Sequence, residues 1–279
     1  MLLGGALACV LGLLPAQPTG RRELLHAIPL VAAGLSTQLA PPIAAHAASG
    51  SAAKVTDRVF MDVRVIQRYD VEVLEDAAVR GRIVFGLFGA DAPQAVQRFL
   101  DFTKGTIGQF AQRADGPSYA SSGFEKLRPN EVVEGGRITG FDQEPFAGVM
   151  EYQYRSRLVP LRPLLEVNSL RHDRRGLLTK KRLTPGPEFA ITLGAAPKLD
   201  GSHEVFGEIL DGANILELIE TLPYITGSSN EGKGTAADAV FNAQRAFMLS
   251  IAKGAGDTRA ADRTGQLLRR VEITKVGVL

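Results

Sequence analysis

The amino-acid sequence predicts a mainly β protein, an antiparallel barrel with a few capping helices. Short apolar segments with strand-like patterns outnumber the helical patterns, and they do not alternate with helices in a regular βαβ rhythm. The composition, 45% hydrophobic and 22% charged over 279 residues, is that of a globular protein and not of a disordered or fibrous one. Together these observations predict a closed antiparallel sheet.

Two strands are expected near the start of the folded part. Residues 59–65 alternate loosely between apolar and polar side chains, as a half-buried strand does. Residues 82–88 are nearly all apolar, which indicates a central strand. The acidic segment between them, residues 69–80, is expected to be an excursion of the hairpin.

A helix is expected after the second strand. Asp91 can cap its free amide groups, and Pro93 lies in the first turn, where a missing N–H has no cost. Gly105 is expected to end the helix. Four residues fall on one face of this helix: Val96, Phe99, Leu100 and Thr103.

The second half of the chain repeats this pattern of short elements. Strands are expected over residues 189–193 and 205–209, and a helix over residues 214–222. Residues 271–276 alternate again and predict a closing strand.

One stretch falls outside this scheme and predicts an inserted helix. Residues 236–258 have a helical pattern, and a Gly- and Ser-rich run, residues 227–234, precedes them. We expect this helix, part of an insertion at about 225–263, to pack on the barrel rather than to form a separate domain. Its buried face would be formed by Val240, Phe241, Ala243, Phe247, Leu249 and Ile251.

The N-terminus resembles a twin-arginine targeting signal. Arg21 and Arg22 stand directly before a moderately apolar run, residues 24–44. The run ends in the small-x-small pattern of Ala45 and Ala47, which a signal peptidase can cleave. A transmembrane anchor is the alternative, since about 20 apolar residues can span a bilayer, but prolines and polar residues interrupt the run.

This signal predicts the organisation and the compartment of the protein. Residues 1–47 are expected to be removed, residues 48–56 to be a linker, and residues 57–279 to be the folded domain. The expected compartment is the thylakoid lumen of a chloroplast, with a bacterial periplasm as the alternative. The only cysteine, Cys9, leaves with the signal, so disulfides, cysteine-ligated zinc and a thiol nucleophile are excluded from the mature chain.

Seven spaced blocks give the fold class a more specific form. They are GRIVFGLF at 81–88, DAPQAVQRF at 91–99, FEKLRP at 124–129, EGG at 134–136, GLLT at 176–179, GPEFAI at 186–191 and LDGSHEVFG at 199–207. In order and spacing they resemble the cyclophilin family of peptidyl-prolyl isomerases, over roughly residues 57–223 and the last strand. The resemblance implies a closed eight-stranded antiparallel β-barrel with capping helices.

The resemblance also implies a site that rotates X–Pro amide bonds, whose barrier is about 18–20 kcal/mol. Cyclophilins use a guanidinium, helped by a glutamine amide, beside an apolar pocket for the proline ring. The matching catalytic positions here are Lys126 and Glu134. The matching substrate-binding positions are Phe124, Glu131, Val132, Glu188, Phe189, Ala190, Lys198, Leu199 and His203.

Several of these positions depart from the family pattern, so weak activity is expected. Lys126 replaces the arginine, and it lacks the fixed fork of a guanidinium. Glu134 replaces the glutamine and is expected to pair with Lys126 and neutralise it. The aromatic residues of the pocket are lost at Glu131, Ala190 and Lys198. A catalytically inactive binding or assembly factor for thylakoid complexes is therefore the alternative function.

The expected partners are proline-containing segments of lumenal proteins, among them subunits of photosynthetic complexes. The basic clusters at 171–175 and 180–182 predict a solvated face, and nucleic acid is not expected because no aromatic residues are interleaved. We expect no cofactor and no metal, since His172 and His203 are the only histidines of the mature chain. A monomer without a membrane span is expected.

Overall fold

The computed structural model describes residues 53–69, 73–146, 149–226, 236–254 and 263–279. The targeting residues Arg21, Arg22, Ala45 and Ala47, the expected boundary at residue 47 and the Gly- and Ser-rich run lie outside the described residues.

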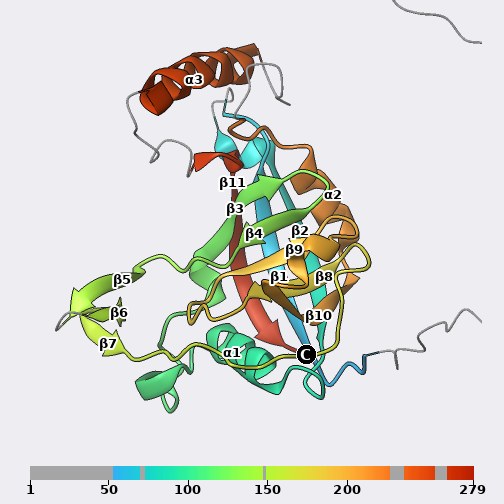
Figure 1. Cartoon of the computed structure of the whole chain (residues 1–279), viewed down its shortest axis with the longest axis vertical. Helices are drawn as coiled ribbons and strands as arrows, with labels where there is room; N and C mark the ends of the chain where they lie inside the picture. The colour runs from blue at the N-terminus through green and yellow to red at the C-terminus, as the bar shows by residue number, and fades with distance from the viewer. Residues whose placement is uncertain (1–52, 70–72, 147–148, 227–235, 255–262) are drawn as a thin grey trace, which may run out of the picture. The chain divides into compact units, whose positions relative to one another are not determined.

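Eight strands close into an antiparallel barrel (Figure 1), which confirms the expected fold class. Their order around the barrel is β1-β11-β3-β4-β9-β8-β10-β2, and every neighbouring pair is antiparallel. The strands are β1 (Asp57–Ile66), β2 (Ala78–Leu87), β3 (Ser122–Arg128), β4 (Val132–Gly135), β8 (Leu177–Lys181), β9 (Phe189–Thr192), β10 (His203–Asp211) and β11 (Gln266–Val278).

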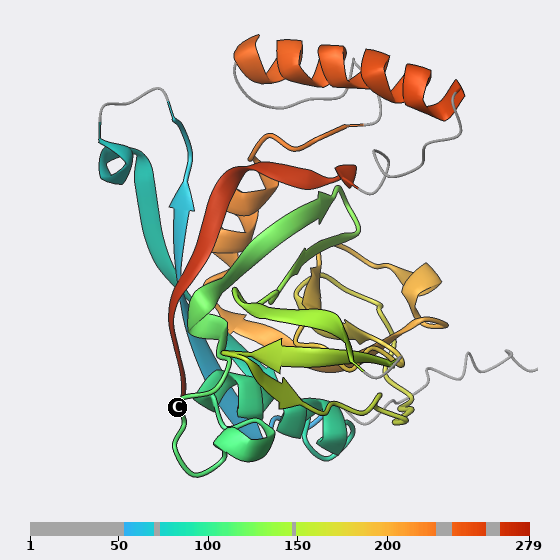
Figure 2. The same cartoon turned by 90° about the vertical axis from the view of Figure 1, so that its left-hand side faces the viewer.

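The first and last strands show why the alternating patterns predicted this fold. Met61 and Val63 of β1 are buried, as is Ile273 of β11, while the residues between them point away from the core. Strands β1 and β11 pair along most of their length, so the two ends of the domain close the barrel together. Figure 2 shows the hairpin of β1 and β2, in blue and cyan, extending from this barrel.

Helix α1 (Pro93–Lys104) begins and ends as expected, but its cap differs. The N-cap position is Ala92, one residue after Asp91, and Asp91 makes no capping bond, so that expectation is wrong. The carboxylate of Glu166, from a distant loop, accepts the N–H groups of Gln94 (3.1 Å) and Ala95 (2.9 Å). A negative charge is favourable at a helix N-terminus, and its source here is distant in sequence.

The other expected elements are present. Helix α2 (Ala213–Glu220) packs its apolar face on β2, with Ile215, Leu216 and Ile219 buried. Short 3₁₀ helices connect the strands: η1 (Leu74–Ala77), η2 (Gly108–Phe110), η3 (Tyr119–Ser121) and η4 (Pro197–Leu199). No helix in the described ranges is both long and apolar enough to cross a bilayer.

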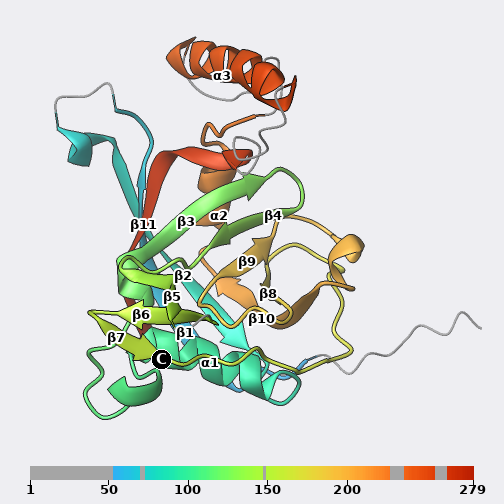
Figure 3. The same ribbon diagram turned by 60° about the vertical axis from the view of Figure 1, so that its left-hand side comes forward.

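A second sheet was not predicted from the sequence. It consists of β5 (Phe141–Phe146), β6 (Val149–Tyr154) and β7 (Arg157–Val159), in that order, and lies beside α1 (Figure 3). Phe141 packs edge-on against Phe102 of α1 at 5.7 Å, and Tyr154 packs against Phe110 at 5.7 Å. These aromatic contacts attach the sheet to the domain.

The inserted helix, α3 (Ala236–Gly254), is present, but its expected apolar contact face is wrong. Val240, Phe241 and Phe247 are 66%, 45% and 65% exposed. Ala243 is also exposed, whereas the side chains of Leu249 and Ile251 lie outside the described part.

Polar side chains on the opposite face make the contacts instead. The carboxylate of Asp238 forms an ion pair with Arg269 of β11 at 2.6 Å. The side chain of Asn242, one turn later, donates to the Tyr224 carbonyl (3.1 Å) and accepts the N–H of Thr226 (3.3 Å). The apolar residues lie away from this row, because positions 238 and 242 share a different side of the helix.

Candidate functional site

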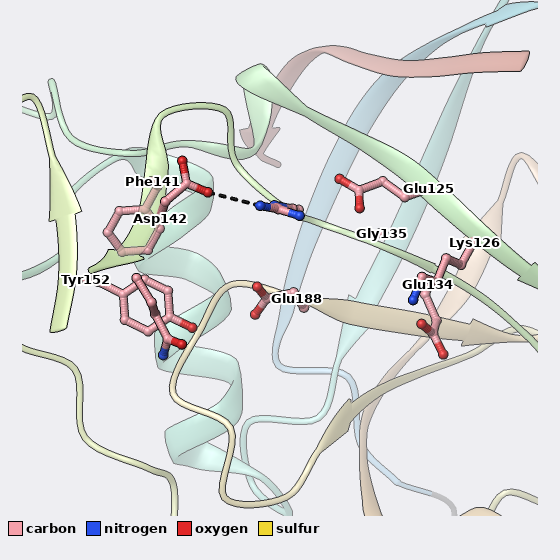
Figure 4. A pocket seen from close by; sticks show the side chains of 10 residues that line it. Glu125, Lys126, Glu134, Gly135, Phe141, Asp142, Tyr152 and Glu188 are labelled. Carbon is pink, nitrogen blue, oxygen red and sulfur yellow. Dashed lines mark hydrogen bonds and ion pairs between the residues drawn. The ribbon is translucent and has the colours of Figure 1, made fainter. Parts of the chain in front are cut away.

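Two adjoining cavities open on the barrel beside strands β3, β4 and β9. We call the first the β9 groove, a cavity of about 470 Å³. The second, the β5 chamber, has about 600 Å³ and reaches the second sheet, β5-β6-β7, which we call the inserted sheet (Figure 4). Both are lined by Lys126, Glu134 and Glu188, so they form one continuous site.

Strand register explains why these residues meet. Lys126 of β3 lies opposite Glu134 of β4, and Glu134 lies opposite Ala190 of β9. Residues directly opposite one another in a sheet project to the same face. A row of three predicted site residues therefore crosses three neighbouring strands.

Six of the predicted residues line the β9 groove. They are Lys126, Glu134, Glu188, Phe189, Ala190 and His203. The remaining five do not line it. Phe124, 3% exposed, lies in the core and packs edge-on against Phe189 at 5.9 Å.

The other four predicted residues form two pairs next to the groove. Val132 and Leu199 are buried together with Ala190 in a small apolar cluster. Lys198 and Glu131 form an ion pair of 2.6 Å and line a separate small cavity. A salt bridge is therefore present at two positions where the family pattern has aromatic residues.

The expected pairing of Glu134 with Lys126 is wrong. Glu134 instead binds Arg128, whose Nη2 lies 2.7 Å from its Oε1. Arg128 also binds Glu131 through Nη1 at 2.8 Å. Its planar fork can hold two carboxylates at once, which an ammonium cannot do with fixed geometry. Within the described part of the chain, the side chain of Lys126 makes no hydrogen bond or ion pair.

Arg128 was not predicted as a site residue, although it lines the β9 groove. Its Nε is buried and has no hydrogen-bond partner among the described residues. Side chains two positions apart on a strand share a face, so Arg128 follows Lys126 on the same side of β3. This two-residue spacing from Lys126 is the sequence feature that could have indicated Arg128 as a site residue.

His203 lies at the edge of the groove as a neutral side chain. Burial lowers its pKa to about 4, and the nearby Arg128, His172 and Lys181 act in the same direction. Its Nδ1 lies 2.8 Å from the Ser202 hydroxyl.

The second histidine has a structural position. His172 is 1% exposed and contacts Asp200 through Nδ1 (2.7 Å) and Thr179 through Nε2 (2.8 Å). It therefore fixes the turn that precedes His203. Among the residues that the structure describes, no group of three His, Cys, Asp or Glu side chains could hold a metal ion.

Lys180 is a second residue that sequence reasoning missed. It is buried below the loop before β9, and its Nζ donates to the carbonyl oxygens of Gly186 and Glu188. Burial lowers its pKa to about 8, although the nearby Glu188 carboxylate opposes this change. The ammonium therefore positions the loop that carries Glu188 into both cavities.

Comparison with known proteins identifies the family. Residues 70–239 match the family described as cyclophilin type peptidyl-prolyl cis-trans isomerase/CLD, which is more than half of the chain. The chain belongs to the cyclophilin family. This cyclophilin is 29% identical over 172 residues to peptidyl-prolyl cis-trans isomerase D of Saccharomyces cerevisiae, covering 61% of this chain and 65% of the yeast protein.

Two further relatives show the breadth of the match. The rhodopsin-specific isozyme of peptidyl-prolyl cis-trans isomerase from Calliphora vicina is 28% identical, over 62% of this chain and 64% of the fly protein. A mouse protein named probable inactive peptidyl-prolyl cis-trans isomerase-like 6 is 30% identical, over 55% of this chain and 47% of its own. This cyclophilin thus matches less than two thirds of the length of each of these relatives.

Proposed function

We propose that this cyclophilin is a peptidyl-prolyl cis-trans isomerase of weak intrinsic activity that acts on X–Pro segments of lumenal proteins. The observation that carries the proposal is the gathering of Lys126, Glu134, Phe189 and His203 around one groove. Three of its relatives are named as isomerases, and one of these is named as probably inactive.

The chemistry requires positioning and electrostatics but no covalent step. Rotation about the X–Pro bond localises the lone pair on the amide nitrogen, and a preorganised donor stabilises that state. Lys126 supplies an ammonium that no other described residue engages. Arg128 supplies an Nε–H group that is buried and unpaired. Lys126 can donate directly to a peptide in the β9 groove, whereas Arg128 can do so once its guanidinium turns from Glu131 and Glu134 toward the peptide.

The weak activity that we propose follows from the residues around the proline ring. Ala190 offers a small floor, and each large apolar side chain missing from a pocket forfeits roughly 1.5–3 kcal/mol of burial. The carboxylates of Glu131 and Glu134 also partly neutralise the Arg128 guanidinium. Both features reduce binding and turnover without removing the donors.

The test is a rate measurement on a short peptide with one X–Pro bond, in a protease-coupled assay or by NMR exchange spectroscopy. Wild type is expected to exceed the uncatalysed rate by a small factor, and Lys126→Ala with Arg128→Ala is expected to return it to background. Rates equal to background in the wild type would exclude the isomerase.

A catalytically inactive binding or assembly factor is the second candidate. The ion pair of Lys198 with Glu131 favours it, because charged groups stand beside the groove where a proline ring needs apolar contacts. Binding of proline peptides without any exchange between cis and trans forms would select this function.

We also propose that residues 1–47 direct the protein to the thylakoid lumen, with photosynthetic subunits among its clients. The support is the sequence pattern of Arg21, Arg22, Ala45 and Ala47. Mass spectrometry of the mature N-terminus checks the cleavage site, and fractionation of organelles checks the compartment. A mature protein that begins at Met1 contradicts this proposal.

A further inference from the structure

The β5 chamber differs in character from the β9 groove. The inserted sheet supplies one of its walls, through Phe141, Asp142, Gln143 and Tyr152 (Figure 4). The opposite wall comes from β3 and β4, and Glu188 stands where the chamber meets the groove. The chamber is therefore open to any segment that flanks a residue in the groove.

Its charges are predominantly negative. Four carboxylates line it, against two cations: Glu125, Glu134, Asp142 and Glu188 against Lys126 and Arg137. Arg137 is already bound to Asp142 at 3.1 Å. Lys126 belongs to the lining that the chamber shares with the groove. The part of the chamber next to the inserted sheet thus has no cation of its own other than Arg137 among the described lining residues.

Tyr152 is an independent sign that the chamber receives a ligand. Tyr152 is 6% exposed, and its hydroxyl makes no hydrogen bond to any described residue. In Figure 4 this hydroxyl points toward the Glu188 carboxylate. The hydroxyl lines the chamber, so a ligand there can hydrogen-bond to it.

The aromatic wall fits a cation. The rings of Phe141 and Tyr152 stack at 4.8 Å with an interplanar angle of 21°. Ring faces attract ammonium and guanidinium groups, by about 0.5–2 kcal/mol. Burial, and then the Glu188 charge, raise the pKa of Tyr152 to about 12, so the hydroxyl stays protonated at neutral pH.

We propose that the β5 chamber binds the side chain of a lysine or arginine that stands near the proline of the client peptide. This inference rests on the proposed function, since the proline occupies the β9 groove. The cation lies against the stacked rings, with Glu188 and Asp142 as charge partners and the Tyr152 hydroxyl as a hydrogen-bond acceptor. Aspartate or glutamate at the same position meets four carboxylates and is disfavoured.

The test uses matched synthetic peptides that contain one X–Pro bond. Lysine, alanine or glutamate is placed in turn at each of three positions before and after the proline. Dissociation constants come from NMR titration of the full-length mature protein, and cis-trans exchange is recorded in the same samples. At one or more positions the lysine peptide is expected to bind about fivefold more tightly than the alanine peptide, and the glutamate peptide more weakly.

Variants of the chamber locate the effect. Asp142→Lys is expected to reverse the preference, and Tyr152→Leu, which removes both ring and hydroxyl, to reduce it. The matched control is Asp173→Asn, since Asp173 is an exposed carboxylate that binds an arginine at 3.1 Å, as Asp142 does, but lines neither cavity. A one-dimensional NMR spectrum and a urea unfolding curve verify that each variant is folded.

The outcomes separate this inference from the proposed function. If proline peptides bind and exchange equally well whatever their charge, the chamber has no cation specificity and the inference is wrong, while the isomerase stands. If no proline peptide binds at all, the proposed function itself fails. A lysine preference that Asp142→Lys leaves unchanged also overturns the inference, because the cation then binds elsewhere.

Discussion

Arg128 and Glu134 form an ion pair across strands β3 and β4, with 2.7 Å between Nη2 and Oε1. The pair leaves Lys126, the residue directly opposite Glu134 in the register, without a bound carboxylate. It also holds a guanidinium in the groove two residues away from the position where the family pattern has one. The site therefore has two cations on one face of β3, of which one is fixed and one is free.

The first prediction concerns Arg128. Arg128→Ala is expected to lower the catalysed part of the X–Pro exchange rate, the part above the uncatalysed rate, about tenfold or more, since a hydrogen bond from a charged donor is worth roughly 1.5–3 kcal/mol. Arg128→Lys keeps the charge but not the fork, and is expected to give an intermediate rate. NMR exchange spectroscopy measures these rates. Wild-type rates in Arg128→Ala would assign the donor to Lys126 alone.

The second prediction concerns the protonation of His203. Its imidazole is expected to stay neutral from pH 8 to about pH 4, because burial and Arg128 keep its pKa low. Since the pKa in the folded state lies below the ordinary value of 6.5, the unfolded chain binds more protons between these values. The free energy of unfolding therefore falls as pH decreases from 6.5 to 4, relative to His203→Gln.

The ring resonances of His203 check this directly, assigned by their loss in His203→Gln. Arg128→Ala is the informative partner variant, because removal of that charge is expected to raise the His203 pKa. A His203 titration centred near 6.5 in the wild type contradicts the prediction.

The local sequence pattern was sufficient to predict the strands of the barrel but not the second sheet. The strand at 59–65 was visible because its buried residues alternate, with Met61 and Val63 inward. Strand β5 has the sequence FDQEPF, with polar residues and Pro145 inside it. It lacks the alternation of apolar and polar residues that predicts a strand. Its position depends on Phe141 packing against α1, a contact that only the folded chain shows.

The site was predictable to the same extent. Spacing of the blocks indicated that Lys126, Glu134 and Ala190 would meet, and strand register brings them into one row. Spacing could not show which carboxylate binds which cation, because side-chain length and reach decide that. Phe124 and Leu199 were predicted at the site from their places in the matching blocks, and they lie buried. One sequence does not distinguish an apolar residue of the core from an apolar residue that contacts a ligand.

The third prediction tests the distant cap of α1. Glu166→Ala is expected to reduce the free energy of unfolding by about 1 kcal/mol, as loss of an N-terminal cap does. Asp91→Ala is the matched control, since Asp91 is the nearer carboxylate in sequence and makes no capping bond. It is expected to change stability by less than about 0.5 kcal/mol. Urea unfolding of both variants measures the difference, and equal effects would rule out Glu166 as the cap.

The fourth prediction uses the buried Lys180. Its pKa of about 8 lies below the value of 10.5 for a free lysine, so the unfolded chain binds more protons between these pH values. The free energy of unfolding of the wild type, relative to Lys180→Met, is therefore expected to rise between pH 8 and 10.5, by roughly 3 kcal/mol in total. Below pH 8 the difference is expected to be constant, because lysine is charged in both states.

Urea unfolding of the two proteins at several pH values between 6 and 10.5 measures this change. Lys181→Met, which removes the exposed lysine at the next position, controls for the loss of one charge from the same strand. A wild-type curve that runs parallel to that of Lys180→Met throughout shows that the ammonium is not destabilised by burial. A difference that rises with pH shows that burial destabilises the charged form of Lys180. Because its ammonium donates to the carbonyl groups of Gly186 and Glu188, this lysine then holds the loop that carries Glu188 although it loses hydration there.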